Sequence, residues 1–303
     1  MSIINASPVS DLPRIGADNA FRKGTISATS GTARYAVDWR ADRVWAPGEG
    51  THTITAVCDD PVECDYAFIA FHNWTGMEIT IQALIGSWTT VASFTPVDDG
   101  PVWVNFAPAS SPQWRVTVAA GDVEAAIAIL SVGKSLALEQ GMQSGWSPVE
   151  LSGSSEVVDA VSEDGVLVAR TLRRRPSKAR MSLSNVSEAW MHSVWAPVRD
   201  RLIRQPWALS WSPNEPHARS CLAWTDGAPH ADSYSGPGLL SVSWNICMVD
   251  RRDVSALDTP QEAPPEPPPL PVLIASIMLD SDIWLGEGEI ADPGYILIDD
   301  YPT

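Results

Sequence analysis

Short stretches in the first half of the chain alternate between apolar and polar positions, as a half-buried β-strand requires. In MEITIQALI, Ile79, Ile81, Ala83 and Ile85 fall on one face and the polar residues between them on the other. Similar runs occur at 51–57, 101–107 and 113–120, separated by clusters of Gly, Pro, Asp or Ser. Several short strands at close spacing, without a convincing helix, predict a β-sandwich or jelly roll.

Two runs are apolar almost throughout, which is typical of strands buried on both faces. The first is AAIAILSVG at 125–133. The second is DYAFIAF at 65–71, where Tyr66, Phe68 and Ile69 would fill two buried faces. The following HNWTG predicts the turn that ends this strand, because Asn and Gly suit tight backbone geometry and His can satisfy an open backbone group.

The second region mixes element types. A strand is predicted at 165–174, followed by a helix over 182–205 with Ser184 or Asn185 as its N-cap and Pro197 as a point of breakage or kinking. The apolar stripe of this helix repeats every four residues, at Val186, Trp190, Val194, Val198 and Leu202. Further strands are predicted within 206–213, 220–227 and 239–250. The pattern predicts a small sheet or barrel with one helix packed across it.

The C-terminal part differs in composition. Residues 258–271 are half proline and carry only acidic charges, so we expect an extended spacer of ~40 Å at ~3.1 Å per residue. Residues 272–303 have short runs of strand composition that cannot bury a core alone, and we expect them to dock on another subunit or on copies of themselves. The predicted division is therefore 1–150, 151–257, 258–271 and 272–303.

Charge narrows the range of partners. The formal net charge is −17, which disfavours binding to nucleic acid phosphates. Residues 1–150 hold 8 basic and 16 acidic residues, 151–257 hold 12 and 11, and 258–303 hold none and 10. We expect no membrane insertion, because no apolar run is long enough and the first residues lack the profile of a secretory signal.

The one basic concentration comprises Arg170, Arg173, Arg174, Arg175, Lys178 and Arg180. A nucleic-acid arm is one interpretation, and pairing with acidic surfaces of neighbouring subunits, including the tail of another copy, is the plainer one. The predicted assembly contacts are Arg173, Arg174, Arg175, Ile283, Trp284, Tyr295 and Ile296.

Local signatures of catalysis are missing from the sequence. The five His residues form no metal-binding motif, and no nucleophile elbow, P-loop or dinucleotide fingerprint occurs. Cys58 and Cys64 enclose DDPVE, a spacing that favours a turn between strands over a zinc knuckle. All four cysteines are predicted to be buried free thiols. We therefore expect no enzymatic activity, no metal and no cofactor.

Fourteen Trp residues against five Phe and five Tyr is an unusual ratio. Trp can fill the core of β-layers and subunit contacts, which we take as its main role here, or form platforms for sugar rings. The candidate ligand residues are Trp39, Trp45, His72, Asn73 and Trp74, because aromatic faces stack on sugars while Asn and His bond hydroxyls.

Taken in order, these segments resemble a known family. Residues 20–133 look like the galactose-binding-like (discoidin-type) jelly roll of tail proteins of long-tailed bacteriophages. The residues that carry this resemblance are DWRADRVWAPGEGTHTITA (38–56), CDYAFIAFHNW (64–74), ITIQALIGSW (79–88), PVWVNF (101–106), PQWRVTV (112–118) and IAILSVGKSLAL (127–138). The second region, with its basic strand, Trp-containing helix and PWALSWSPNEP, is similar in layout to minor and distal tail proteins.

The resemblance implies a structural and adaptor component of a virion tail tip or baseplate, made in the host cytoplasm and present in several copies. Its partners would be other tail-tip proteins and copies of itself. Two alternatives stay open, namely a receptor-binding module for a host surface glycan, and an accessory domain of a cell-wall glycosidase.

Overall fold

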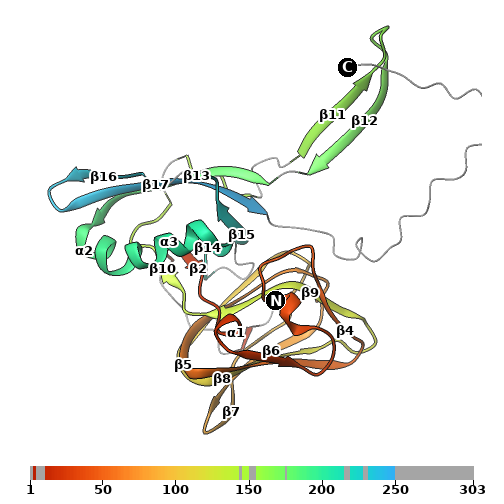
Figure 1. The fold of residues 1–303 in the computed structure, drawn as a ribbon, viewed down its shortest axis with the longest axis vertical. Coiled ribbons are helices and arrows are strands. Elements are labelled where there is room, and N and C mark those ends of the chain that lie inside the picture. The colour runs from red at the N-terminus through yellow and green to blue at the C-terminus, as the bar shows by residue number, and fades with distance from the viewer. Residues whose placement is uncertain are drawn as a thin grey trace, which may run out of the picture. The chain divides into compact units, whose positions relative to one another are not determined.

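The computed structural model describes residues 3–4, 11–142, 145–149, 155–174, 176–214, 219–227 and 231–249, all within one compact unit of residues 1–260. Every strand pairing among them is antiparallel. One continuous helix spans residues 188–204 (Figure 1). The chain is thus a mainly β protein, which confirms the predicted fold class. No described helix is long and apolar enough to cross a lipid bilayer.

The N-terminal sheet contains eight strands, in the order β1-β7-β6-β8-β5-β9-β4, with β3 paired to β5. Their bounds are β1 (Ile3–Ile4), β3 (Thr25–Ala28), β4 (Trp45–Gly48), β5 (Thr51–His72), β6 (Glu78–Ile85), β7 (Ser87–Phe94), β8 (Val102–Ala119) and β9 (Ala125–Gly133). The short helices α1 (Ala20–Lys23) and η1 (Ala33–Ala36) lie on either side of β3 in the sequence.

Two long strands bend this sheet into two layers. Residues 51–57 of β5 pair with 113–119 of β8, whereas residues 66–69 of β5 pair with 102–105 of β8. The pairing is irregular between these parts, so each strand turns from one layer into the other. The runs 101–107 and 113–120, predicted as separate strands, are therefore parts of β8.

Two cysteines lie in the other long strand, β5. Cys58 and Cys64 lie along the single strand β5, which corrects the prediction of a turn between them: pairing with β8 is interrupted after Val57 and resumes at Val62 without a reversal of the chain. All four cysteines are free and buried, as predicted.

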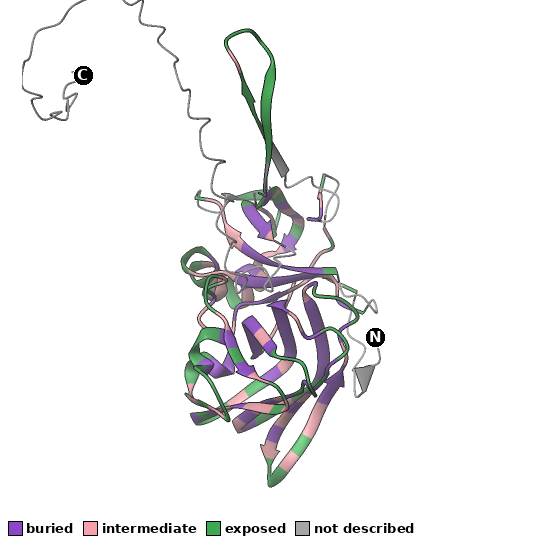
Figure 2. Cartoon of the chain, turned by 90° about the vertical axis from the view of Figure 1, so that its right-hand side faces the viewer, coloured by how far each residue is buried: buried purple, intermediate pink, exposed green. Residues whose placement is uncertain are grey.

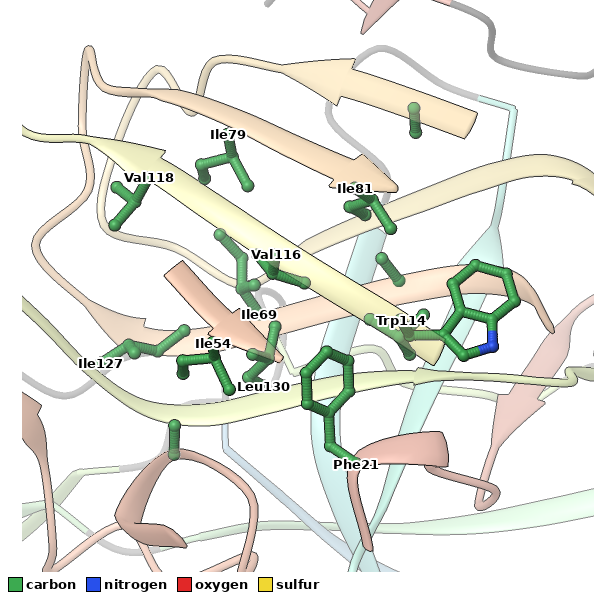
Figure 3. Close-up of a cluster of buried hydrophobic side chains, with 14 of the residues drawn as sticks. Phe21, Ile54, Ile69, Ile79, Ile81, Trp114, Val116, Val118, Ile127 and Leu130 are labelled. Atoms are coloured by element: carbon green, nitrogen blue, oxygen red, sulfur yellow. The ribbon is translucent and has the colours of Figure 1, made fainter. Parts of the chain in front are cut away.

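The main core fills the space between the two layers (Figure 3). Ile54, Ile81 and Val116 project from one layer, and Ile69 and Leu130 from the other, each at most 3% exposed. These are alternate residues of their strands, so the period-2 pattern in the sequence corresponds to the side chains that leave water. Burial of this kind contributes ~25 cal/mol per Å² of apolar surface.

A second sheet has the order β10-β2-β14-β15-β17-β13, with β16 paired to β17. Its bounds are β2 (Arg14–Gly16), β10 (Leu136–Ala137), β13 (Ser177–Ser187), β14 (Trp207–Ser212), β15 (Arg219–Thr225), β16 (Ala231–Gly236) and β17 (Leu239–Val249). Both β2 and β10 come from the segment that the sequence assigned to the jelly roll. The chain therefore threads from the second sheet at β2 through the sandwich strands β3 to β9 and back to the second sheet at β10, rather than dividing near residue 150.

The helix packed against this sheet runs through α2 (Glu188–Trp190), η2 (Met191–Trp195) and α3 (Ala196–Arg204). It begins six residues later than predicted, because residues 182–187 pair with β17 instead. Asn185, a predicted cap, lies at a bulge with φ 59°. Pro197 does not break the helix. The turn before it is π-helical, and proline, which lacks an N–H, sits in the first turn of α3.

One layer of the sandwich packs on the second sheet along a contact that we call the seam. Tyr66, Phe68 and Trp103 of the sandwich meet Ala208 and Leu222 of the second sheet. The rings of Tyr66 and Trp103 stack with their centroids 4.5 Å apart. Since Ile69 faces the main core and Phe68 faces the seam, this part of β5 is buried on both faces, as predicted.

Hydrogen bonds also link the two sides of the seam. Trp103 Nε1 donates to Asn105 Oδ1 at 2.8 Å, and Asn105 Nδ2 donates to the carbonyl of Pro213 at 2.8 Å. Tyr66 Oη donates to the carbonyl of Asp18 at 2.6 Å. These bonds satisfy the buried polar atoms of Tyr66, Trp103 and Asn105, which lowers the cost of desolvating them.

A separate hairpin consists of β11 (Ser155–Val161) and β12 (Leu167–Arg174). Its turn closes at Gly165, whose φ of 78° suits glycine. Figure 2 shows both strands exposed along their described length.

Candidate ligand-binding face

The three predicted ligand tryptophans are buried. Trp39, Trp45 and Trp74 are 6%, 1% and 0% exposed. Trp45 and Trp74 meet edge to face with centroids 6.4 Å apart, and Trp45 Nε1 donates to the carbonyl of Ser30 at 2.7 Å. These rings pack the protein and leave no open face on which a sugar could stack.

His72 and Asn73 fasten the end of strand β5. The Nε2 of His72 lies 3.0 Å from the carbonyl of Gly100, and its Nδ1 accepts from the backbone N–H of Trp74 at 3.1 Å. Both bonds fit a neutral ring protonated at Nε2. Burial lowers the pKa of His72 to about 4, which keeps the ring neutral. Asn73 bonds the backbone of Glu124 and Ala126 at 2.7 and 2.8 Å. The arrangement matches the predicted strand terminus.

The basic cluster is only partly within the described side chains. Arg170 makes a two-pronged ion pair with Asp159 at 2.7 and 2.9 Å, and Lys178 pairs with Asp226 at 2.8 Å. Arg173 and Arg174 are described as backbone of β12. The other predicted assembly contacts, Arg175, Ile283, Trp284, Tyr295 and Ile296, lie outside the described residues.

Reactive groups do not gather in the part of the chain that the structure describes. There, no group of three or more His, Cys, Asp or Glu side chains converges as metal ligands would. Burial raises the pKa of the Cys64 thiol well above its ordinary value, so the sulfur stays a thiol.

The larger described pocket, about 510 Å³, lies between the helix and strands β2 and β10. Its lining includes the apolar Ile15 and Val198 and the cations Lys134 and Arg201. Both cations are already paired, Lys134 with Glu63 at 3.2 Å and Arg201 with Asp18 at 3.3 Å. A smaller pocket of about 160 Å³ is lined by Phe21, Arg22, Gly24, Ile26, Arg34, Val37 and Asp38. Neither pocket presents an accessible aromatic face.

The sandwich layer that lacks a covering sheet presents a polar surface, which we call the open face. Its side chains come from β5, β8, β6 and β7, at the positions that alternate with the main core. The register aligns them in two rows, one of Thr80, Thr117 and Thr53 and one of Gln82, Arg115 and Thr55. All six are partly exposed.

Trp88 of β7 is the aromatic ring of the open face. It is partly exposed, and the Cζ of Arg115 lies 4.2 Å from its ring centroid. Arg115 Nε also bonds Gln82 Oε1, and Gln82 Nε2 donates to Thr90 Oγ1 at 3.1 Å. Stacking and hydrogen bonds thus hold the indole, guanidinium and amide in one fixed group.

The open face is nearly neutral in a chain of net charge −17. Segments 51–57, 78–84 and 113–119 together hold two charged residues, Glu78 at the edge and Arg115 near the centre. Threonine favours strands for steric reasons, which alone would explain several hydroxyls. It does not explain a fixed Trp–Arg–Gln group among them. The sequence showed the alternation of β6, but the strand partners that bring Arg115 beside Gln82 and Trp88 were not visible in it.

Comparisons with known proteins give similarity at the level of structure only. No family model matches the chain, and no curated protein matches it. Chitosan-binding module 1 of a chitosanase/glucanase from Paenibacillus sp. IK-5 is 19% identical with a TM-score of 0.33, covering 38% of this chain and 98% of that one. Module 2 of the same enzyme, in complex with chitotriose, is 21% identical with a TM-score of 0.33, covering 38% and 99%.

A third similar structure is CpGH89CBM32-5 from Clostridium perfringens, in complex with GalNAc-β-1,3-galactose. It is 15% identical with a TM-score of 0.33, covering 38% of this chain and 97% of that one. In each case most of this chain lies outside the match.

Proposed function

We propose that the protein binds glycan through the open face of its N-terminal sandwich. The observation that carries the proposal is the fixed group of Trp88, Arg115 and Gln82 beside a row of three threonines. A glycan offers C–H groups that pack on an indole and hydroxyls that bond amides and other hydroxyls. A nearly neutral face suits such a ligand, because it contains few charges that would have to be desolvated on binding.

The geometry favours an extended ligand over a single sugar. Neighbouring strands lie ~4.8 Å apart, so the row of Thr80, Thr117 and Thr53 presents hydroxyls across three strands. The guanidinium of Arg115 can also hold a carboxylate with two parallel bonds. We therefore expect the strongest binding from chains that contain an acidic sugar.

The test is a glycan array with the full chain, followed by titration of the best ligand. We expect Trp88→Ala to weaken binding about tenfold, the loss of ~1.4 kcal/mol that one aromatic contact can account for. The matched control is Tyr35→Ala, which removes a partly exposed ring stacked by Arg43 outside the open face, and should bind as the unchanged protein does. Absence of binding at millimolar concentration, or an equal loss in both variants, contradicts the proposal.

A second candidate function is the one that the resemblance implies, a structural and adaptor component of a phage-like tail tip or baseplate. It would assemble through β-pairing and complementary charge with copies of itself and other tail-tip proteins. The observation that favours an assembly role is the exposed apolar hairpin of β11 and β12. Light scattering of the full chain should then show an oligomer, and a monomer at every concentration counts against this role.

A further inference from the structure

The hairpin of β11 and β12 exposes apolar side chains on both of its faces. Of the fourteen exposed large apolar residues among the described side chains, six lie between positions 157 and 168. They are Val157, Val158, Val161, Val166, Leu167 and Val168, with exposed fractions from 38% to 69%. Single exposed apolar residues are ordinary, but a cluster of this kind marks a contact surface.

The backbone of the hairpin is equally uncovered. Its two strands pair with each other and with no other described strand, so each has an outer edge of unpaired N–H and C=O groups. A two-stranded hairpin is only marginally stable by itself in water, and native proteins usually cover or charge such edges. A third strand laid along one edge would satisfy both the backbone and the apolar faces.

We infer that this third strand comes from residues 272–303 of a second copy of the chain. The inference rests on the assembly role and names its contact. Residues 258–303 hold ten acidic and no basic residues, whereas residues 167–174 of β12 hold three Arg and no acidic residue. Arg170 is already paired with Asp159 of β11, so Arg173 and Arg174 are the charges offered to the tail. The apolar run VLIASIML at 272–279 matches the uncovered valines, and the flanking carboxylates match the arginines of β12.

The length of the spacer favours a second copy over the same one. Ser177, just after β12, pairs with Met248 near the end of β17, so the described chain ends beside the base of its own hairpin. The seven residues of β11 measure ~23 Å at ~3.3 Å per residue. An extended spacer of ~40 Å would be longer than the whole hairpin, which favours a docking site on a neighbouring copy.

The test is photo-crosslinking in the full chain. A benzophenone amino acid replaces Val168, and unlabelled and ¹⁵N-labelled copies are mixed before irradiation, at a concentration where light scattering shows an oligomer. We expect crosslinked peptides to join position 168 to residues 272–303, with one partner labelled and the other unlabelled. If every crosslink to residues 272–303 joins two peptides with the same isotope label, the tail comes from the same copy and the inference is wrong.

A charge variant and its control separate this contact from assembly in general. Arg173→Glu with Arg174→Glu should lower the yield of tail crosslinks about fivefold, because two attractive charges become repulsive. Arg34→Glu with Arg204→Glu makes the same net change at exposed positions away from the hairpin, and should leave the yield unchanged. Near-ultraviolet circular dichroism should be the same for both, since the hairpin contains no Trp.

The outcomes are distinguishable. An oligomer whose crosslinks avoid residues 272–303 overturns the tail contact and leaves the assembly role standing. A monomer at all concentrations overturns both. Glycan binding at Trp88 is measured independently of either result.

Discussion

His72 is a polar side chain that the fold uses only in its neutral form. It is 1% exposed, and both ring nitrogens are occupied by backbone groups. Its neighbour Trp74 is fully buried, and Asn73 bonds the backbone of Glu124 and Ala126. From sequence, a His-Asn-Trp trio that closes a strand looks the same as one that lines a ligand site, because both use the same side-chain chemistry. Only burial separates them.

The stability of the protein should therefore depend on pH through His72. Its pKa is about 4 in the folded protein and ~6.5 in an unfolded chain. Between these values the unfolded state binds a proton that the folded state does not, so the free energy of unfolding falls as the pH is lowered from ~6.5 to ~4. The whole shift corresponds to roughly 3 kcal/mol. Urea unfolding at pH 7 and pH 4.5 measures it.

The informative comparison is between variants. His72→Gln keeps a neutral hydrogen-bonding group, so it should be less stable at pH 7 but lose less stability on acidification than the unchanged protein. His192→Gln alters an exposed histidine and should keep the full loss. If His72→Gln and the unchanged protein lose the same free energy between the two pH values, His72 is not the group responsible.

At the scale of elements, the sequence predicted where strands occur better than where they begin and end. The strands β6, β9, β14, β15 and β17 fall where alternation or apolar runs indicated. The start of the helix was misplaced, because Leu183 and Val186 have the three-residue spacing of a helical stripe, and only the bulge between them lets both be buried from a strand. Pairing of residues 177–187 with β17 decides between helix and strand, and that contact spans about sixty residues of sequence.

The N-cap of the helix is the residue that tests this boundary. Ser187 Oγ accepts from the backbone N–H of Trp190, and its own N–H and hydroxyl donate to Glu139 at 2.7 Å each. We expect Ser187→Ala to lower the free energy of unfolding by ~1 to 2 kcal/mol. Ser184→Ala, at the cap position predicted from the sequence, should change it by less than ~0.5 kcal/mol. The reverse order in chemical denaturation would place the helix start at residue 184.

At the scale of the whole molecule, the division near residue 150 was an interpretation of charge and composition. The structure differs from it because β2 and β10 have three and two residues, too few to carry a periodic signal. Their pairing joins positions more than a hundred residues apart, such as Leu136 with Ile15 and Leu209 with Ile15. The open face could not be predicted from the sequence for a similar reason, because its residues come together only once the register of β6, β7 and β8 is known.

This threading, together with the seam, predicts that the sandwich and the second sheet unfold together. Strand β9 belongs to the sandwich and β14 to the second sheet, and both are largely buried. Hydrogen exchange followed by mass spectrometry should give amides of β9 and β14 the same opening free energy within ~1 kcal/mol. Two transitions in calorimetry, with β14 opening well before β9, would show that the two sheets are independent.

The bend of β5 and β8 through both layers also limits how this protein can vary. In a sandwich of separate strands, a layer can change its sequence while the other layer stays constant. Here one strand supplies Ile54 to one layer and Ile69 to the other, and β8 does the same with Val116 and Val104. An inserted or deleted residue in either strand would shift the register of both layers at once. Length changes should accumulate instead at turns such as the one at Gly86 between β6 and β7, where each strand belongs to one layer.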